Sequence, residues 1–275
     1  GSPNRSLGWL DRAVNYGGMP WLELEGAVNA RDVGGLPTVD GAAIAERILL
    51  RADNLQGLTP ADIKLLVDDI GLSTVVDLRS THEVVSEGPG PLRAVEAVRH
   101  VHHSVLPEAG EATDVTADML FARRQEALAR YPEDPMCALY LGYLEDRPDS
   151  VVGALRSISE AEGAALVHCA AGKDRTGVVV ALSLTVAGVH RDAVVADYAA
   201  TGHRISAILT RLRASPTYAE DLARRPDDEE HRPREATMAA FLAQVDQRYG
   251  GVLEYLSAHG FGPAEADTLR ARLLG

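Results

Sequence analysis

The chain has 275 residues, of which 46% are hydrophobic and 24% charged, with a net charge of −13. This length and composition predict one α/β domain that can bury a substantial core. The acidic charge argues against a nucleic-acid partner and against tight binding to anionic membranes. Two cysteines are too few for a disulfide framework, and no apolar run reaches the ~20 residues of a membrane span. We therefore expect no membrane insertion and a cytoplasmic location, with signal-independent export left open.

Short apolar runs alternate with helical patterns along the chain, which predicts a parallel sheet. The Thr59-Pro60 pair places a capping hydroxyl and a first-turn proline at the start of a helix. The Asp40-Gly41 pair predicts a hairpin turn between residues 36–39 and the following strand. The expected fold class is α/β, with a central, mostly parallel sheet of about four to five strands flanked by helices. The expected strands are residues 47–51, 74–78, 97–103 and 165–168.

Two helical regions, residues 114–146 and 192–213, carry apolar stripes. Such stripes either pack into the core or form a helical lid that shields a reactive cysteine from oxidants. Residues 224–234 are charged and broken by prolines, which predicts a solvated loop or a disordered insertion. We expect a single domain over residues 1–275, made of a motif-bearing core at 26–190 and a helical C-terminal part at 191–275.

Three histidines lie close together in the sequence, at positions 100, 102 and 103. In a strand, His100 and His102 share one face, but no cysteine or acidic residue accompanies them at a ligand spacing. The chain also lacks a glycine-rich nucleotide fingerprint. We therefore predict no metal and no other cofactor.

The most informative segment is the sequence HCAAGKDRTG at residues 168–177. It follows a short apolar run and opens an apolar helix, so its amides would converge on an anion at a helix N-terminus. A helix N-terminus and a guanidinium both stabilise a thiolate, which makes Cys169 the expected nucleophile. The planar fork of Arg175 would hold two phosphate oxygens at once. These features predict a phosphate-binding nucleophile loop.

The other loop residues have supporting roles in this interpretation. Gly172 permits the backbone to curl, His168 would orient the cysteine through hydrogen bonds, and the Thr176 hydroxyl would help the thiolate leave a phosphocysteine. The residues expected to bind the phosphate are His168, Ala170, Ala171, Gly172, Lys173 and Gly177.

The cysteine, the arginine six positions later and the following threonine resemble the signature loop of the protein tyrosine phosphatase superfamily. Residues 26–35 and 75–80 resemble two further blocks of a bacterial tyrosine phosphatase family of atypical dual or triple specificity, whose loop carries Gly-Lys-Asp-Arg-Thr-Gly. The resemblance implies the superfamily fold and a metal-free phosphomonoester hydrolase with a phosphocysteine intermediate. Members of that family act on phosphotyrosine, sometimes on phosphoserine and phosphothreonine, and sometimes on phosphoinositides.

The reaction also benefits from a general acid that protonates the leaving oxygen. Asp174 lies inside the loop, which favours its proximity to the phosphate. Asp77 ends a strand, as Cys169 does, and the carboxyl ends of parallel strands share one crevice; Arg79, however, is close enough to neutralise it. A third acid on a mobile segment stays open as an alternative. The chain has no Trp-Pro-Asp sequence, which is the acid loop of many eukaryotic relatives.

The substrate is less well defined than the reaction. Lys173 would recognise a second phosphate or simply attract anions. We expect a phosphorylated protein, a phosphoinositide or a small-molecule phosphate as the partner. The alternatives are a phosphatase of a soluble nucleotide or sugar phosphate, a non-catalytic phosphate-binding module, and a sulfurtransferase, which the Arg-Thr-Gly ending of the loop disfavours.

Overall fold

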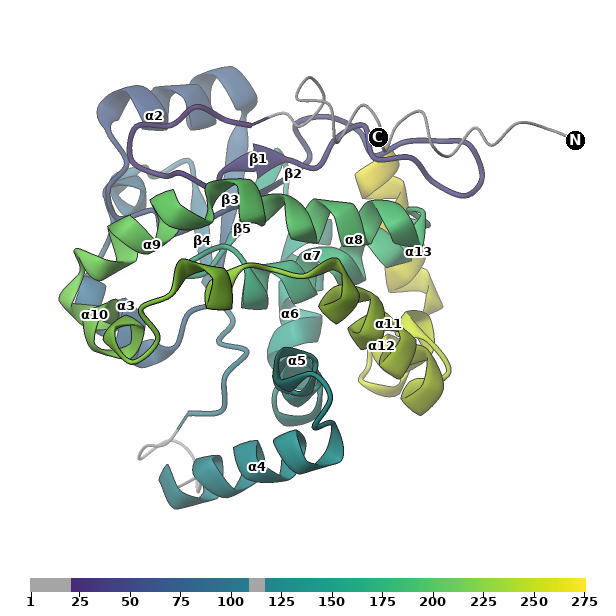
Figure 1. The fold of residues 1–275 in the computed structure, drawn as a ribbon. Helices are drawn as coiled ribbons and strands as arrows, with labels where there is room; N and C mark the ends of the chain where they lie inside the picture. Colours follow the sequence, from purple (N-terminus) through teal and green to yellow (C-terminus); the bar gives the residue numbers. More distant parts are fainter. Residues whose placement is uncertain (1–20, 109–116) are drawn as a thin grey trace, which may run out of the picture.

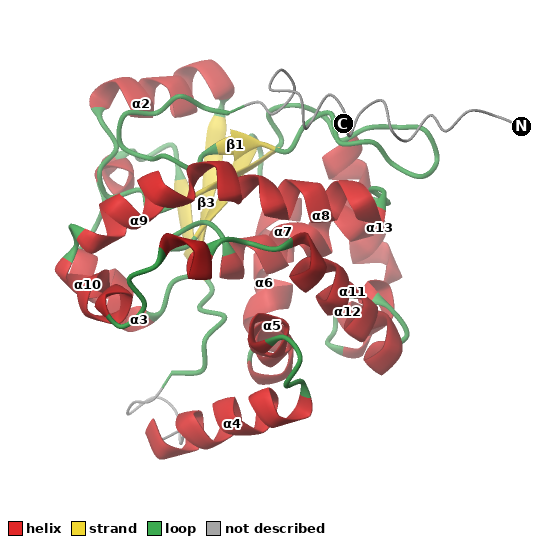
Figure 2. Ribbon diagram, in the orientation of Figure 1, coloured by secondary structure: helices red, strands yellow, loops and turns green. Residues whose placement is uncertain are grey.

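A five-stranded sheet forms the centre of the molecule. The structure is a computed structural model and describes residues 21–108 and 117–275. The strand order is β1-β2-β5-β3-β4, in which β1 is antiparallel to β2 and the other pairs are parallel. Figure 1 shows helices on both sides of this sheet, and Figure 2 separates the two element types by colour. The predicted α/β class with a mostly parallel sheet is confirmed. The strands are β1 (Arg31–Asp32), β2 (Leu49–Ala52), β3 (Leu72–Asp77), β4 (Arg99–His102) and β5 (Ala164–His168).

The prediction of a hairpin between residues 36–39 and the following strand is wrong, because residues 36–39 do not pair with β2. The turn at residues 40–41 forms, but it joins Pro37 to Ala43 in a single antiparallel bridge rather than to β2. The antiparallel neighbour of β2 is β1, which has only two residues. A strand of two residues has no alternating pattern, so it could not be predicted from the sequence. Arg47, expected in the strand, instead lies in the preceding turn with a φ of 60°.

Successive strand residues point to opposite faces, and both faces are buried. Leu49, Val76 and Val167 pack into the larger apolar cluster. Leu50 and Leu166 face a smaller cluster on the opposite side of the sheet. The helices are α2 (Pro60–Lys64), η1 (Leu65–Ile70), α3 (Thr81–Glu87), η2 (Pro91–Ala94), α4 (Ala117–Arg130), α5 (Pro135–Asp146), α6 (Pro148–Ser159), α7 (Asp174–Val186), α8 (Arg191–Ala200), η3 (Thr201–Arg204), α9 (Ile205–Arg213), α10 (Pro216–Ala223), η4 (Asp228–His231), α11 (Glu235–Tyr249), α12 (Val252–Ala258) and α13 (Pro263–Leu274).

Local capping explains two helix starts near the strand ends. The Thr59 hydroxyl accepts a hydrogen bond from the Asp62 amide, and the Asp62 carboxylate accepts one from the Thr59 amide, which confirms the predicted start. Ser80 and Glu83 form the same reciprocal arrangement at the start of α3. Each arrangement satisfies two backbone donors that the helix leaves unpaired.

The two striped regions are helical where they are described. The first contains α4 and α5, and its residues 114–116 lie outside the described residues. Figure 1 shows α4 below the rest of the molecule, and α5 is the helix that it contacts most. The second contains α8, η3 and α9. Residues 224–234 include the 3₁₀ turn η4, whose His231 is buried and donates to the Arg225 carbonyl oxygen.

Candidate active site

The loop with the signature sequence connects β5 to α7. The helix begins at Asp174, so Arg175 and Thr176 belong to its first turn, three residues earlier than the apolar run at 177 suggested. Gly172 has a φ of 65°, and a Cβ atom at this position would lie 2.4 Å from the Ala52 carbonyl oxygen. A side chain is therefore excluded there by both backbone conformation and space. Cys169 is buried, with 2% of its surface exposed.

Three carbonyl groups of the loop accept hydrogen bonds from residues outside the loop. The Ala170 carbonyl accepts from the Asn54 amide at 2.9 Å, the Ala171 carbonyl from Asn29 Nδ2 at 2.9 Å, and the Gly172 carbonyl from Arg51 Nη2 at 2.8 Å. With its acceptors engaged on the outside, the loop can direct its N–H groups towards its centre. Such a concave set of amides at a helix N-terminus binds an anion.

A buried ion-pair network lies behind these bonds. Asp197 on α8 accepts from Arg31 Nε at 3.0 Å and from Arg51 Nη1 at 2.6 Å. Arg31 also donates to Asn29 Oδ1 at 2.8 Å. Burial alone would raise the pKa of Asp197, but the two arginines outweigh it and hold the pKa below its usual value. The block at residues 26–35 thus supports the loop from behind.

Arg175 is held by a carboxylate that the sequence reasoning missed. Its Nη1 and Nη2 atoms donate to Glu83 Oε2 at 2.6 Å and to Oε1 at 2.9 Å. Burial would lower the pKa of Arg175, but the charges of Cys169 and Glu83 raise it above the usual value. Glu83 is also the residue that caps α3 with Ser80. The Ser-x-x-Glu spacing is a capping signal in the sequence, although it does not reveal the contact with Arg175.

Asp77 is engaged by a neighbour. Arg79 donates from Nε to Asp77 Oδ1 at 3.0 Å and from Nη2 to Oδ2 at 2.7 Å. Burial raises the pKa of Asp77, whereas the hydrogen bonds and the charge of Arg79 lower it, and the pKa lies well below the usual range. His168 Nε2 lies 3.6 Å from Asp77 Oδ2, and its Nδ1 donates to the Cys169 carbonyl at 3.2 Å. Burial lowers the pKa of His168 to about 4, so the ring is neutral at neutral pH.

Asp174 has different partners. Its Oδ1 atom accepts from the Tyr140 hydroxyl at 2.6 Å and from Lys173 Nζ at 3.0 Å. Its Oδ2 atom makes no hydrogen bond within the described parts of the chain, and the side chain is 23% exposed. Burial would raise the pKa of Asp174, but Lys173 and the Tyr140 hydrogen bond lower it below the usual value. Tyr140 was not predicted as a site residue from the sequence, in which it lies 34 positions from Asp174, on α5.

The structure thus brings Cys169, Asp174, Arg175 and Thr176 together at the start of α7. Thr176 Oγ1 is buried and finds no hydrogen-bond partner among residues 21–108 and 117–275, so its role towards the thiolate stays a prediction. Lys173 is buried and paired with Asp174. Asp77 lies near the Nε2 atom of His168, whereas the Nδ1 atom of that ring bonds to the Cys169 carbonyl oxygen.

The three neighbouring histidines have separate partners. His100 Nε2 donates to the Leu92 carbonyl, His102 Nε2 to the Arg79 carbonyl, and His103 Nε2 is 3.1 Å from the Ser157 hydroxyl. Among the described residues, no three histidine, cysteine or acidic side chains are placed to hold a metal ion. In the same ranges no helix has the length and apolar character needed to cross a membrane.

Comparisons with known proteins agree with this site. The chain is 28% identical over 284 residues to the triple specificity protein phosphatase PtpB of Mycobacterium tuberculosis, covering 92% of this chain and 99% of that protein. It is also 28% identical over 249 residues to a tyrosine-protein phosphatase of Nostoc commune, covering 86% of this chain and 78% of that protein. The model of the tyrosine phosphatase family matches residues 22–275. The chain therefore belongs to the tyrosine phosphatase family, whose members are cysteine-dependent hydrolases.

Proposed function

We propose that this chain is a protein phosphatase in which Cys169 and Arg175 carry the reaction. The observation that supports this most is the loop whose carbonyl groups are bonded outwards by Asn29, Arg51 and Asn54, next to the buried cysteine and arginine. Glu83 binds the end of the Arg175 guanidinium, so its Nε–H and one proton on each terminal nitrogen remain for phosphate oxygens. This is the electrostatic stabilisation that phosphoryl transfer needs.

In the first step, the Cys169 thiolate attacks phosphorus. The S–P bond forms, the bond between phosphorus and the leaving oxygen breaks, and Asp174 gives its proton to that oxygen. In the second step, Asp174 accepts a proton from water as the water oxygen attacks phosphorus. The S–P bond then breaks, which releases inorganic phosphate and restores the thiolate.

We assign the acid role to Asp174 because only one of its two carboxylate oxygens is engaged. Oδ1 is fixed by Tyr140 and Lys173, which leaves Oδ2 to carry the proton. A substrate phosphate is itself anionic, and a like charge nearby raises the pKa of a carboxylate, so binding would favour the protonated acid. Asp77 is a poorer candidate because both of its oxygens are held by Arg79.

For the substrate, we propose phosphotyrosine in proteins first, with phosphoserine, phosphothreonine and phosphoinositides as further substrates. PtpB, a relative along nearly its whole length, is described as a triple specificity protein phosphatase. A second phosphate on the substrate would have to compete with Asp174 for Lys173, because these two side chains already form an ion pair at 3.0 Å. This pairing favours phosphotyrosine over phosphoinositides.

The test is phosphate release from phosphopeptides, phosphoinositides and metabolite monophosphates. We expect the largest kcat/KM on phosphotyrosine peptides and no activity in Cys169→Ser. Cys137→Ser is the matched control, because Cys137 is the other buried cysteine and lies on α5. Activity that survives Cys169→Ser, or that requires an added metal, would overturn the mechanism. A preference for metabolite phosphates would overturn the substrate assignment alone.

A further inference from the structure

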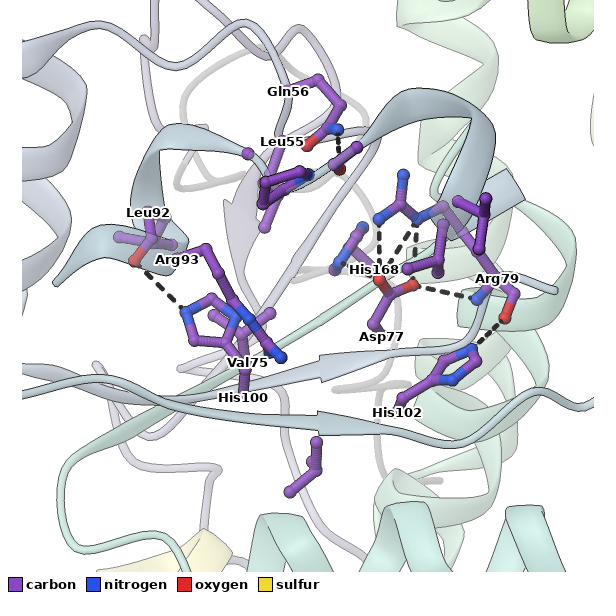
Figure 3. A pocket seen from close by; sticks show the side chains of 16 residues that line it. Leu55, Gln56, Val75, Asp77, Arg79, Leu92, Arg93, His100, His102 and His168 are labelled. Atoms are coloured by element: carbon purple, nitrogen blue, oxygen red, sulfur yellow. Dashed lines mark hydrogen bonds and ion pairs between the residues drawn. The ribbon is translucent and has the colours of Figure 1, made fainter. Parts of the chain in front are cut away.

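A cavity lies beside the catalytic loop, with His168 in its wall. It has a volume of about 420 Å³, within the ~300–1,000 Å³ that is usual for small-molecule sites. Its walls come from the carboxyl-terminal parts of β3 and β4, from α3 and from the segment at residues 88–93. Figure 3 shows Leu92, Arg93 and His100 at the left of this cavity and Asp77, Arg79 and His168 at the right.

Most of the cavity lining is apolar. Leu55, Val75 and Leu92 are almost fully buried and belong to the smaller apolar cluster beside the sheet. The rim is held in place by Gln56, whose Nε2 donates to the Glu87 carbonyl at 2.8 Å. These walls suit a flat apolar or aromatic body, because water in such a space finds few partners.

The charges around the cavity do not balance. Asp77 and Arg79 neutralise each other. The side chain of Arg93 is exposed at the cavity, and its guanidinium makes no hydrogen bond or ion pair with any residue that the structure describes. Burial lowers the pKa of His100, and it lowers the pKa of His168 to about 4, so His168 adds no positive charge to the cavity at neutral pH. One free guanidinium beside an apolar space suits an anionic head group.

The cavity is separate from the phosphate cradle. None of residues 169–177 lines it, although His168 forms part of its wall. The Nε2 atom of His168 lies 3.6 Å from Oδ2 of Asp77, a residue that lines the cavity. Its Nδ1 atom donates to the carbonyl oxygen of the nucleophile, Cys169. An occupant would therefore share a wall with the catalytic loop without lying in the path of the substrate phosphate.

We propose that this cavity is a second ligand site, which binds a small organic anion with an apolar body, such as an aromatic carboxylate. The carboxylate binds Arg93, and the ring lies against Leu55, Val75 and Leu92. Because the occupant abuts His168, it changes kcat rather than competing with the phosphorylated substrate.

The probe for this site is 1-naphthoate, titrated calorimetrically into the full chain whose catalytic loop is saturated with orthovanadate. Two comparison compounds separate the contributions: 1-naphthalenemethanol has the ring without the charge, and acetate has the charge without the ring. Arg93→Gln removes the proposed partner. Arg99→Gln is the matched control, since Arg99 is an exposed arginine on β4 that does not line the cavity.

We expect 1-naphthoate to bind the vanadate-loaded protein at one site and both comparison compounds to bind at least about tenfold more weakly. Arg93→Gln should weaken naphthoate about tenfold, the size expected for one hydrogen-bonded charge pair, while Arg99→Gln leaves affinity unchanged. In steady-state assays, naphthoate should alter kcat at constant KM. Displacement of naphthoate by vanadate, an unchanged affinity in Arg93→Gln, or no saturable binding would overturn the proposal. The binding readout does not depend on turnover, so it stands apart from the proposed function.

Discussion

The Tyr140 hydroxyl donates a 2.6 Å hydrogen bond to Oδ1 of Asp174. The Tyr198 hydroxyl lies 2.7 Å from that of Tyr140. Because Tyr140 has one proton and gives it to Asp174, Tyr198 must donate to Tyr140. Both rings are buried and come from different helices, α5 and α8. The orientation of the proposed acid is thus set by helices well outside the signature loop.

Replacing Tyr140 by phenylalanine should move the pH profile. The Asp174 carboxylate loses a donor, so its pKa rises, and the basic limb of kcat, where the acid loses its proton, moves to higher pH by about one unit. The measurement is kcat against pH on 4-nitrophenyl phosphate. Tyr255→Phe is the control, because this buried hydroxyl donates to the Leu144 carbonyl on the same helix α5, away from the loop. A lower kcat with an unmoved limb would show that Tyr140 has only a structural role.

The two candidate acids should differ in their dependence on the leaving group. Asp174→Asn should lower kcat about 10²–10⁴-fold on an alkyl phosphate, and less on 4-nitrophenyl phosphate, whose leaving group needs little protonation. Asp77→Asn should leave this dependence unchanged and instead lower stability, by up to about 3–5 kcal/mol, because the nearly buried Arg79 loses its partner. Kinetics on both esters and urea unfolding of both variants test this. The reverse pattern would move the acid role to Asp77.

The ionisation of Glu83 should make the free energy of unfolding depend on pH in the acidic range. Its pKa is lowered from the usual 4.5 to about 2, because the hydrogen bonds and charge of Arg175 and the Ser80 contacts outweigh the effect of burial. A lowered carboxylate pKa contributes stability that is present above about pH 4.5 and is lost as pH falls towards 2. Urea unfolding of wild type and Glu83→Gln should therefore show a stability difference that shrinks over this interval. A difference that is constant with pH would contradict the assignment.

Asp197→Asn should both destabilise the protein and impair the loop. It leaves Arg31 and Arg51 without their buried carboxylate, a change that costs about 3–5 kcal/mol in comparable pairs. Because Arg51 holds the Gly172 carbonyl, we also expect kcat/KM to fall. Asp246→Asn is the control, since Asp246 pairs with Arg191 at the surface and should change unfolding free energy by less than about 0.5 kcal/mol. Equal effects of the two substitutions would contradict the supporting role.

Only the contiguous parts of the proposed site could be predicted from the sequence. The nucleophile loop, the strand before it and the helix after it could be predicted because each is a local pattern of a few residues. The partners of the loop could not, since Arg51 and Asp197 are 146 positions apart and Glu83 and Arg175 are 92 apart. Such pairs depend on how α3 and α8 pack against the sheet. The role of Tyr140 could not be predicted for another reason, because the sequence pattern of an aromatic residue in an apolar helix indicates a core position.

In the proposed reaction, the phosphoryl group passes through Cys169. Wild-type protein would be mixed with a phosphotyrosine peptide, quenched in acid within one turnover, digested and analysed by mass spectrometry. We predict a phosphorylated peptide containing Cys169, present in Cys137→Ser and absent in Cys169→Ser. Full turnover without phosphate on Cys169 at any quench time, or with phosphate on another residue, would show that Cys169 is not the nucleophile.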